Sequence, residues 1–188
     1  MSKVNSFVLL AVLVILTRLG DLYTTYLVTP DLAEETNILV TQLDFGWPAF
    51  ALSNALLTSL VISLAYYYHF RYRPAKVVGA KSVTTYLSLA YFGDVHKFKH
   101  LFHQWPTQNQ YMQLGHIGYA LPRGVIVMSL LLMTNNWLNL QDGQYSSLLR
   151  TYPYLSFFKQ VIYVSPLLFF LWYGIREEYR RQAYLITQ

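Results

Sequence analysis

The feature that most constrains this chain is a long apolar run with two opposite charges inside it. Residues 7–28 read FVLLAVLVILTRLGDLYTTYLV, and as an α-helix they would rise about 33 Å, enough to cross the hydrocarbon core of a bilayer. Arg18 and Asp21 interrupt the run three residues apart, so a helix places them on one face. Membrane helices carry charged side chains where the protein interior satisfies them. The sequence therefore predicts a membrane helix whose polar face packs against other helices.

Three further apolar runs have the length of membrane spans. We expect helices over residues 47–70, 114–138 and 154–175. Only 12% of the residues are charged, compared with about 25% in soluble domains, and no linker-like stretch divides the chain. These features predict an all-α, polytopic membrane protein in which residues 1–188 form one domain, a four-helix transmembrane bundle.

Residues 82–103 are too polar to form a fifth span. Asp94, Lys97 and Lys99 lie within them, and a charged residue at the centre of a bilayer costs about 2.5–3.5 kcal/mol on insertion scales. We expect this segment to form an additional amphipathic helix in the membrane interface, with aromatic side chains towards the lipid and Lys and His side chains towards water.

The distribution of Lys and Arg predicts the orientation of the bundle. Ten such residues lie at the two ends of the chain and between the second and third spans, whereas the other two loops contain only Arg150. Segments rich in Lys and Arg stay in the cytoplasm. We therefore expect a multi-pass protein of the cell membrane with both termini cytoplasmic. The net charge of +5 then reflects membrane topology, and no nucleic-acid partner is predicted.

The first candidate site is the polar face of the first span. In the expected orientation, the side chains that can meet in the outer half of the membrane come from the first, second and fourth spans. They are Arg18, Asp21, Thr25, Asn54 and Lys159. Two interpretations stay open for this set: ion pairs and amides that fix helix packing, or a site that binds an ion or a ligand.

The loop after the first span adds Glu35 and Asn37, which can cap that polar face. The pattern Asp21-x-x-x-Thr25 followed by Glu35-x-Asn37 resembles a family of small, uncharacterised prokaryotic integral membrane proteins, which have an Asp-x-x-x-Thr helix followed by Glu-x-Asn-Pro. Ile38 stands where that family has proline. The resemblance implies a bundle of about four helices with no assigned activity, and it implies that Asp21, Glu35 and Asn37 act as one unit.

The second candidate site is rich in histidine. The pattern Asp94-x-His96-x-x-x-His100-x-x-His103 places three imidazoles on one helical face, and His116 follows after a turn. Imidazoles at this spacing can converge on zinc or iron. A basic interfacial helix whose side chains reach lipid head groups explains the same pattern. Because no cysteine and no nearby glutamate completes a ligand set, we expect no cofactor and keep a metal at this cluster as the alternative.

The third span contains a further polar pair in its cytoplasmic half. His116 and Arg123 share one helix face, where they can hold a lipid phosphate or neighbouring backbone groups. Pro122 and Pro166 interrupt the third and fourth spans, and the carbonyl groups that they free can line a cavity. Kinks that serve helix packing explain the prolines equally well.

These patterns leave two classes of function. The sequence contains no nucleotide-binding loop, no Gly-x-Ser-x-Gly and no His-Glu-x-x-His motif. We expect a non-enzymatic membrane protein: an accessory or structural subunit of a larger complex or homo-oligomer, or a small bundle that binds a ligand or an ion. The alternative is a membrane-embedded, metal-dependent, lipid-modifying enzyme that uses the histidine cluster. In both classes the partners are membrane lipids.

Overall fold

Four long helices dominate the computed structural model, which describes residues 2–32, 46–141 and 152–186. They are α1 (Lys3–Val28), α3 (Trp47–Tyr66), α5 (Tyr111–Gln141) and α7 (Pro153–Ile186). Each contains a stretch long and apolar enough to cross a membrane, and the stretch in α3 continues into a π-helical turn, η1 (Tyr67–Arg71). The described residues contain no strand. The predicted all-α bundle with four candidate spans is confirmed.

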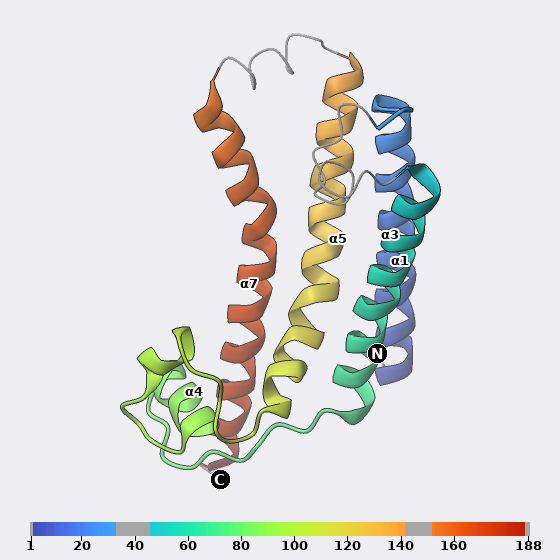
Figure 1. Ribbon diagram of the computed structural model, residues 1–188. Coiled ribbons are helices and arrows are strands. Elements are labelled where there is room, and N and C mark those ends of the chain that lie inside the picture. The colour runs from blue at the N-terminus through green and yellow to red at the C-terminus, as the bar shows by residue number, and fades with distance from the viewer. Residues whose placement is uncertain (1, 33–45, 142–151, 187–188) are drawn as a thin grey trace.

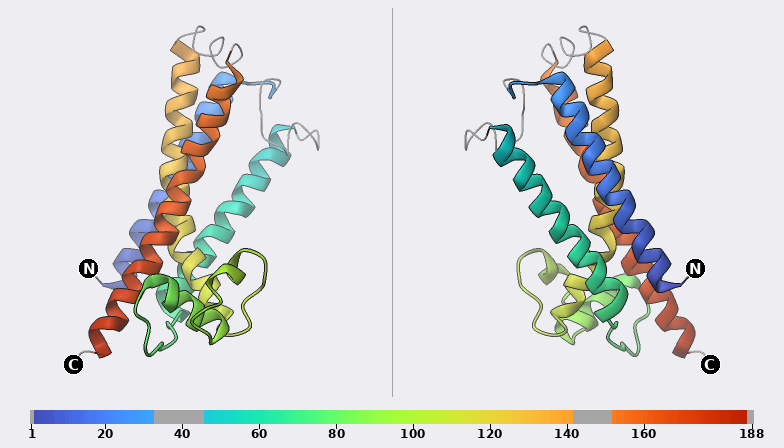
Figure 2. Two further views of the ribbon diagram at one scale, coloured as in Figure 1. Left: turned by 90° about the vertical axis from the view of Figure 1, so that its left-hand side faces the viewer. Right: turned by 90° about the vertical axis from the view of Figure 1, so that its right-hand side faces the viewer.

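Helix α5 is the centre of the bundle. It contacts each of the other three long helices, and it lies between α7 on one side and the α1–α3 pair on the other (Figure 1). Both ends of the described chain lie at the same end of the bundle as the short helix α4 (Val83–Phe92) (Figures 1 and 2). We call this the α4 end. This shared position agrees with the prediction that the termini and the middle segment lie on one side of the membrane.

The surface of the long helices is apolar where a soluble protein would be polar. Leu16, Leu19 and Leu56 are each more than half exposed, although they lie in the middle of helices. Large contiguous apolar surfaces are rare on soluble monomers, whereas lipid tails are a favourable environment for them. The buried positions of α1 are instead Leu10, Val14, Thr17, Asp21 and Thr25, so the polar face of this helix points inward.

Helix α7 extends beyond the apolar run that predicted it. The span was expected over residues 154–175, but the helix continues to Ile186 through a charged stretch. Arg181 and Glu177 lie one turn apart in this extension, with Nε 3.3 Å from the carboxylate, a pairing that supports a solvated helix. Hydropathy marks the part of a helix that fits a bilayer, whereas local hydrogen bonding decides where the helix ends.

The segment that follows η1 differs from the prediction. The amphipathic helix expected over residues 82–103 ends at Phe92, because Gly93 adopts a left-handed conformation (φ 67°) and its N–H bonds back to Leu89. A short 3-10 turn, Phe98–Phe102, follows. The aromatic side chains of α4 also do not face outward: Tyr86, Tyr91 and Phe92 are buried in a small core with Val77 and Met112. The predicted extent of this helix and its lipid-facing aromatic surface are therefore wrong.

Candidate functional site

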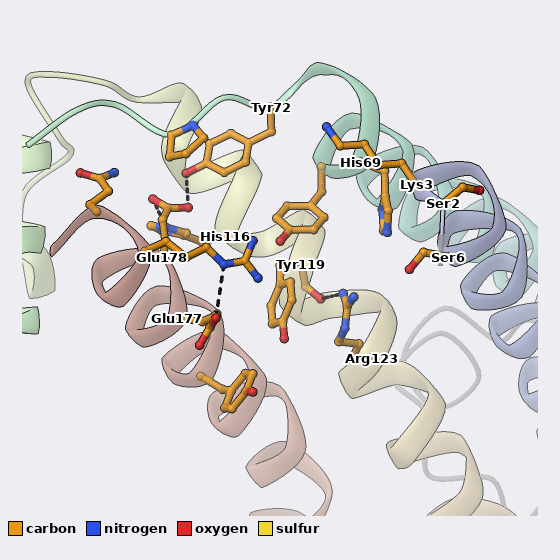
Figure 3. A pocket seen from close by; sticks show the side chains of 16 residues that line it. Ser2, Lys3, Ser6, His69, Tyr72, His116, Tyr119, Arg123, Glu177 and Glu178 are labelled. Atoms are coloured by element: carbon orange, nitrogen blue, oxygen red, sulfur yellow. Dashed lines mark hydrogen bonds and ion pairs between the residues drawn. The ribbon is translucent and has the colours of Figure 1, made fainter. Parts of the chain in front are cut away.

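A cavity of about 750 Å³ lies at the α4 end of the bundle (Figure 3). Ligand pockets in proteins are typically about 300–1,000 Å³. Its lining comes from α1, the turn η1 at the end of the second span, α5, α7 and the chain after η1. The lining residues that carry charge or imidazole groups are Lys3, His69, His116, Arg123, Glu177, Glu178 and Arg181. All four candidate spans thus contribute to one polar cavity near their ends.

One wall of the cavity is a network centred on Glu178 of α7. Its carboxylate accepts hydrogen bonds from the hydroxyl groups of Tyr72, at 2.8 Å, and Tyr86, at 2.5 Å. His116 Nε2 lies 3.4 Å from the same carboxylate, and its Nδ1 lies 2.7 Å from the Tyr91 hydroxyl. A carboxylate only accepts, so Nε2 is the donor to Glu178, and Nδ1 is hydrogen-bonded to the Tyr91 hydroxyl.

The three tyrosines of this network remain protonated. Burial, together with the negative charge of Glu178, raises the pKa of Tyr72, Tyr86 and Tyr91. A neutral hydroxyl group can donate to the Glu178 carboxylate, and it can pair with either form of the His116 ring, because it both donates and accepts. The network is therefore internally complete, and both His116 nitrogens are engaged in it.

Gln182, one turn after Glu178, attaches the same helix to the chain that leaves η1. Its side-chain amide donates to the carbonyl oxygen of Ala75 at 2.6 Å and accepts from the Val77 N–H at 3.0 Å. It also lies 3.1 Å from the Tyr86 hydroxyl. Glu178 and Gln182 together hold the segment that contains α4 against α7.

The opposite wall is positively charged. Arg123 of α5 is half-buried, and its guanidinium donates to the Tyr119 carbonyl oxygen at 2.7 Å. The guanidinium carbon lies 4.0 Å from the centre of the Tyr119 ring and 6.0 Å from that of Tyr68. Among the described ion pairs none involves Arg123. Lys3 and His69 lie on the same side of the cavity (Figure 3).

The first polar face that the sequence singled out forms a separate cluster away from this cavity. Arg18 Nη1 lies 2.6 Å from the Asp21 carboxylate and 3.4 Å from Ser129 Oγ, and Arg18 Nη2 bonds to Asn54 Oδ1. Asp21, Asn54 and Ser129 are all buried. The structure thus brings Arg18, Asp21 and Asn54 together, and the cluster joins α1, α3 and α5.

Thr25 is joined to α5 by a partner that the sequence analysis did not identify. Asn136 Nδ2 lies 3.2 Å from the Thr25 hydroxyl and 3.1 Å from that of Thr24. Lys159 is half-buried on α7, and its place in the predicted set with Arg18, Asp21 and Asn54 stays a prediction. Glu35 and Asn37 lie outside the described residues.

The histidine cluster does not form the helical face that its spacing predicted, because the helix ends before it. His100 and His103 have ring centres 5.1 Å apart, and His100 Nδ1 bonds to Gln104 at 2.7 Å. The backbone N–H of His96 bonds to Asp94 at 3.0 Å. His116, expected as a fourth ligand, belongs to the Glu178 network instead. Within the described part of the chain, no group of three or more His, Cys, Asp or Glu side chains is arranged to hold a metal ion.

Sequence reasoning missed Glu178, Gln182 and their tyrosine partners. The available signal was the pair Glu177-Glu178, which stands in an otherwise basic stretch. Two carboxylates beside several arginines can be read as surface ion pairs, and Glu177 does pair with Arg181 in this way. The burial of Glu178 depends on α4 folding back onto α7, and no local pattern indicates that contact.

Comparison of the chain with protein-family models, with curated proteins and with solved structures finds no match. The geometry of the cavity is therefore what indicates a function.

Proposed function

We propose that this chain is a non-enzymatic integral membrane protein that binds the anionic head group of a membrane lipid in the cavity at the α4 end. The observation that carries the proposal is Arg123. Its guanidinium is half-buried in the cavity wall, contacts two aromatic rings and a carbonyl oxygen, and belongs to none of the ion pairs among the described residues. A phosphate supplies the charge that such a guanidinium binds best.

The position of the cavity suits a lipid. Its lining lies near the ends of the four apolar spans, where the head groups of one leaflet would be found. The Lys and Arg distribution predicts that this end is cytoplasmic, and the cytoplasmic leaflet carries anionic lipids. Tyrosines such as Tyr68 and Tyr173 line the cavity, and tyrosine is typical of the boundary between hydrocarbon and water.

The Glu178 network favours binding over chemistry. A general base needs a nitrogen or carboxylate oxygen within reach of a substrate proton. Both nitrogens of His116 have protein partners, and Glu178 accepts from three side chains. We assign this wall the role of closing the cavity and the Arg123 wall the role of binding the ligand.

The cluster around Arg18 and Asp21 has a structural role in this proposal. Arg18 has three partners, and two of them come from other helices. Such a cluster fixes how α1, α3 and α5 pack, and it leaves the lipid site at the other polar region of the bundle.

The test compares lipid binding to the purified protein and to a variant that lacks the guanidinium. Affinities for phosphatidylglycerol and phosphatidylcholine with identical acyl chains are measured in detergent by native mass spectrometry. The wild type should prefer phosphatidylglycerol, and Arg123→Gln should lose about 10- to 100-fold in affinity for it, the equivalent of a charge-assisted hydrogen bond of roughly 1.5–3 kcal/mol.

Arg176→Gln is the matched control. Arg176 is a half-buried arginine near the same end, and it lies over Trp172 at 4.9 Å without lining the cavity. Its substitution should leave the lipid preference unchanged. Equal affinity for the two lipids, or an equal loss in both variants, would disprove the proposal. Equally tight binding of the soluble head group glycerophosphoglycerol would show that the ligand is a free phosphodiester and not a lipid.

A further inference from the structure

We infer that His69 accepts a hydrogen bond from a hydroxyl group of the bound head group, so that the cavity selects anionic lipids whose head group carries a free hydroxyl. This inference rests on the proposed function and specifies the ligand class. The observation behind it is one nitrogen of the His69 ring, Nε2, in the cavity wall.

The geometry of His69 fixes which of its nitrogens carries the proton. His69 lies in the π-helical turn η1, and its Nδ1 is 2.8 Å from the carbonyl oxygen of Ala65. A carbonyl oxygen only accepts, so Nδ1 is the donor. In the neutral imidazole Nε2 is then an acceptor. Lys3 and Arg123 line the same part of the cavity, so a cationic ring would add a third positive charge there.

Nε2 of His69 has no hydrogen-bond partner among the described residues. The side chain is only 9% exposed, yet it lines the cavity, and Figure 3 shows its ring directed into it beside Lys3. Among the described buried side-chain atoms only Asn139 Oδ1 lacks a partner, so Nε2 of His69 is open to the cavity and free to accept from a ligand. π-Helical turns are frequent at functional sites, and here the turn presents this nitrogen to the ligand space.

The two binding groups together define the ligand. Arg123 and Lys3 bind an acceptor, which is the phosphate oxygen of the head group. Nε2 needs a donor, which an ionised phosphodiester does not contain. A choline group has no donor either, and an ethanolamine ammonium would be repelled by Lys3 and Arg123. An anionic phosphodiester that carries a hydroxyl group supplies both the acceptor and the donor.

The test uses two lipids of equal charge and nearly equal size. Phosphatidylglycerol carries a dihydroxypropyl head group, and phosphatidylpropanol is the same lipid without the two hydroxyl groups. We expect the wild-type protein in detergent to bind phosphatidylglycerol about fivefold more tightly, the effect of one hydrogen bond. His69→Asn retains a donor near the Nδ1 position and removes the Nε2 acceptor, so this variant should bind both lipids equally.

His69→Gln is the matched control, because its side-chain oxygen can reach the Nε2 position and should restore part of the preference. Binding of phosphatidylpropanol by each variant at the wild-type affinity shows that the cavity is still folded. If the wild type does not distinguish the two lipids, or if His69→Asn keeps the preference, the inference is wrong. If both lipids still bind more tightly than phosphatidylcholine, and this binding requires Arg123, only the inference about His69 is wrong. If neither lipid binds more tightly than phosphatidylcholine, the proposed function is wrong as well.

Discussion

Glu178 accepts hydrogen bonds from Tyr72, Tyr86 and His116, which belong to three different segments of the chain. Hydrogen bonds to a charged group contribute about 1.5–3 kcal/mol each, and contributions within one network do not add. Glu178→Gln places an amide NH₂ among these donors and removes the charge. We expect it to lower the free energy of unfolding by about 3 kcal/mol, measured by thermal unfolding in detergent.

Glu177→Gln is the control for that measurement. Glu177 is the neighbouring carboxylate, and its partner Arg181 is largely exposed. Exposed ion pairs contribute at most about 1 kcal/mol, so this variant should melt close to the wild type. Equal losses in the two variants would show that the buried network does not stabilise the α4 end.

Asp21 offers a second prediction at the scale of one residue. Its carboxylate lies 2.6 Å from Arg18 inside an apolar helix, so Asp21→Ala leaves a largely buried cation without its counter-charge. One-sided removal of a buried ion pair typically costs about 3–5 kcal/mol. Asp21→Asn keeps an oxygen acceptor and should cost less.

The same thermal unfolding measurement ranks the Asp21 variants, with Asp94→Asn as the control. Asp94 pairs with Lys97 at 3.9 Å, and both side chains are more than a third exposed. An unchanged melting temperature in Asp21→Ala would contradict the structural role of the Arg18 cluster. Intact folding with lost lipid binding in Asp21→Asn would instead assign a ligand to this cluster.

At the scale of elements, the sequence predicts the long helices better than the short one. The polar stripe of α1 indicates which face is buried, because Thr17, Asp21 and Thr25 recur at helical spacing and are among the buried positions of that helix. The same reasoning fails for α4. Gly93 ends the helix through its positive φ, and the Tyr86 hydroxyl group bonds to Glu178, which lies 92 positions further along the chain. Periodicity contains no information about such a distant partner.

The α4 end should respond to alkaline pH. The pKa of Tyr72, Tyr86 and Tyr91 is raised in the folded protein, so the folded state holds these protons more tightly than the unfolded chain does. Their contribution is complete below the unfolded value of about 10 and is lost as the pH rises through the higher folded values. Amide hydrogen exchange in residues 83–92, corrected for the intrinsic rate, should therefore speed up above about pH 10.

Tyr86→Phe is the comparison for the alkaline response. This variant removes one of the titrating hydroxyl groups from the network, so it should start less stable at pH 8 and lose less on going to high pH. A wild-type pH response that is identical in Tyr86→Phe would contradict the assignment of the response to this network.

At the scale of the whole molecule, the prediction concerns topology. The four candidate spans and the shared position of the termini with α4 are compatible with a multi-pass membrane protein, and the Lys and Arg distribution predicts that the α4 end is cytoplasmic. The chain has no cysteine, so single cysteines can be introduced without background. Asp31→Cys and Asp142→Cys should react with a membrane-impermeant reagent from outside the cell, whereas Lys81→Cys should not.

A reporter fused after Thr107 provides the control for the segment around α4, and it should read the cytoplasmic side. Labelling of Lys81→Cys from outside would reverse the orientation and move the lipid site to the other leaflet. An external reporter at Thr107 together with an internal Lys81 would require a fifth crossing.

The Glu178 network also sets an order of events during synthesis. Tyr86 and Glu178 are 92 positions apart, and ribosomes add about 5–20 residues per second. For roughly 5–20 s the tyrosines of the middle segment have therefore been made while their carboxylate has not. Throughout that interval only earlier contacts, such as the hydrogen bond between Tyr91 and His116, can hold the nascent α4 segment, and the bond to Glu178 is added when the final helix emerges.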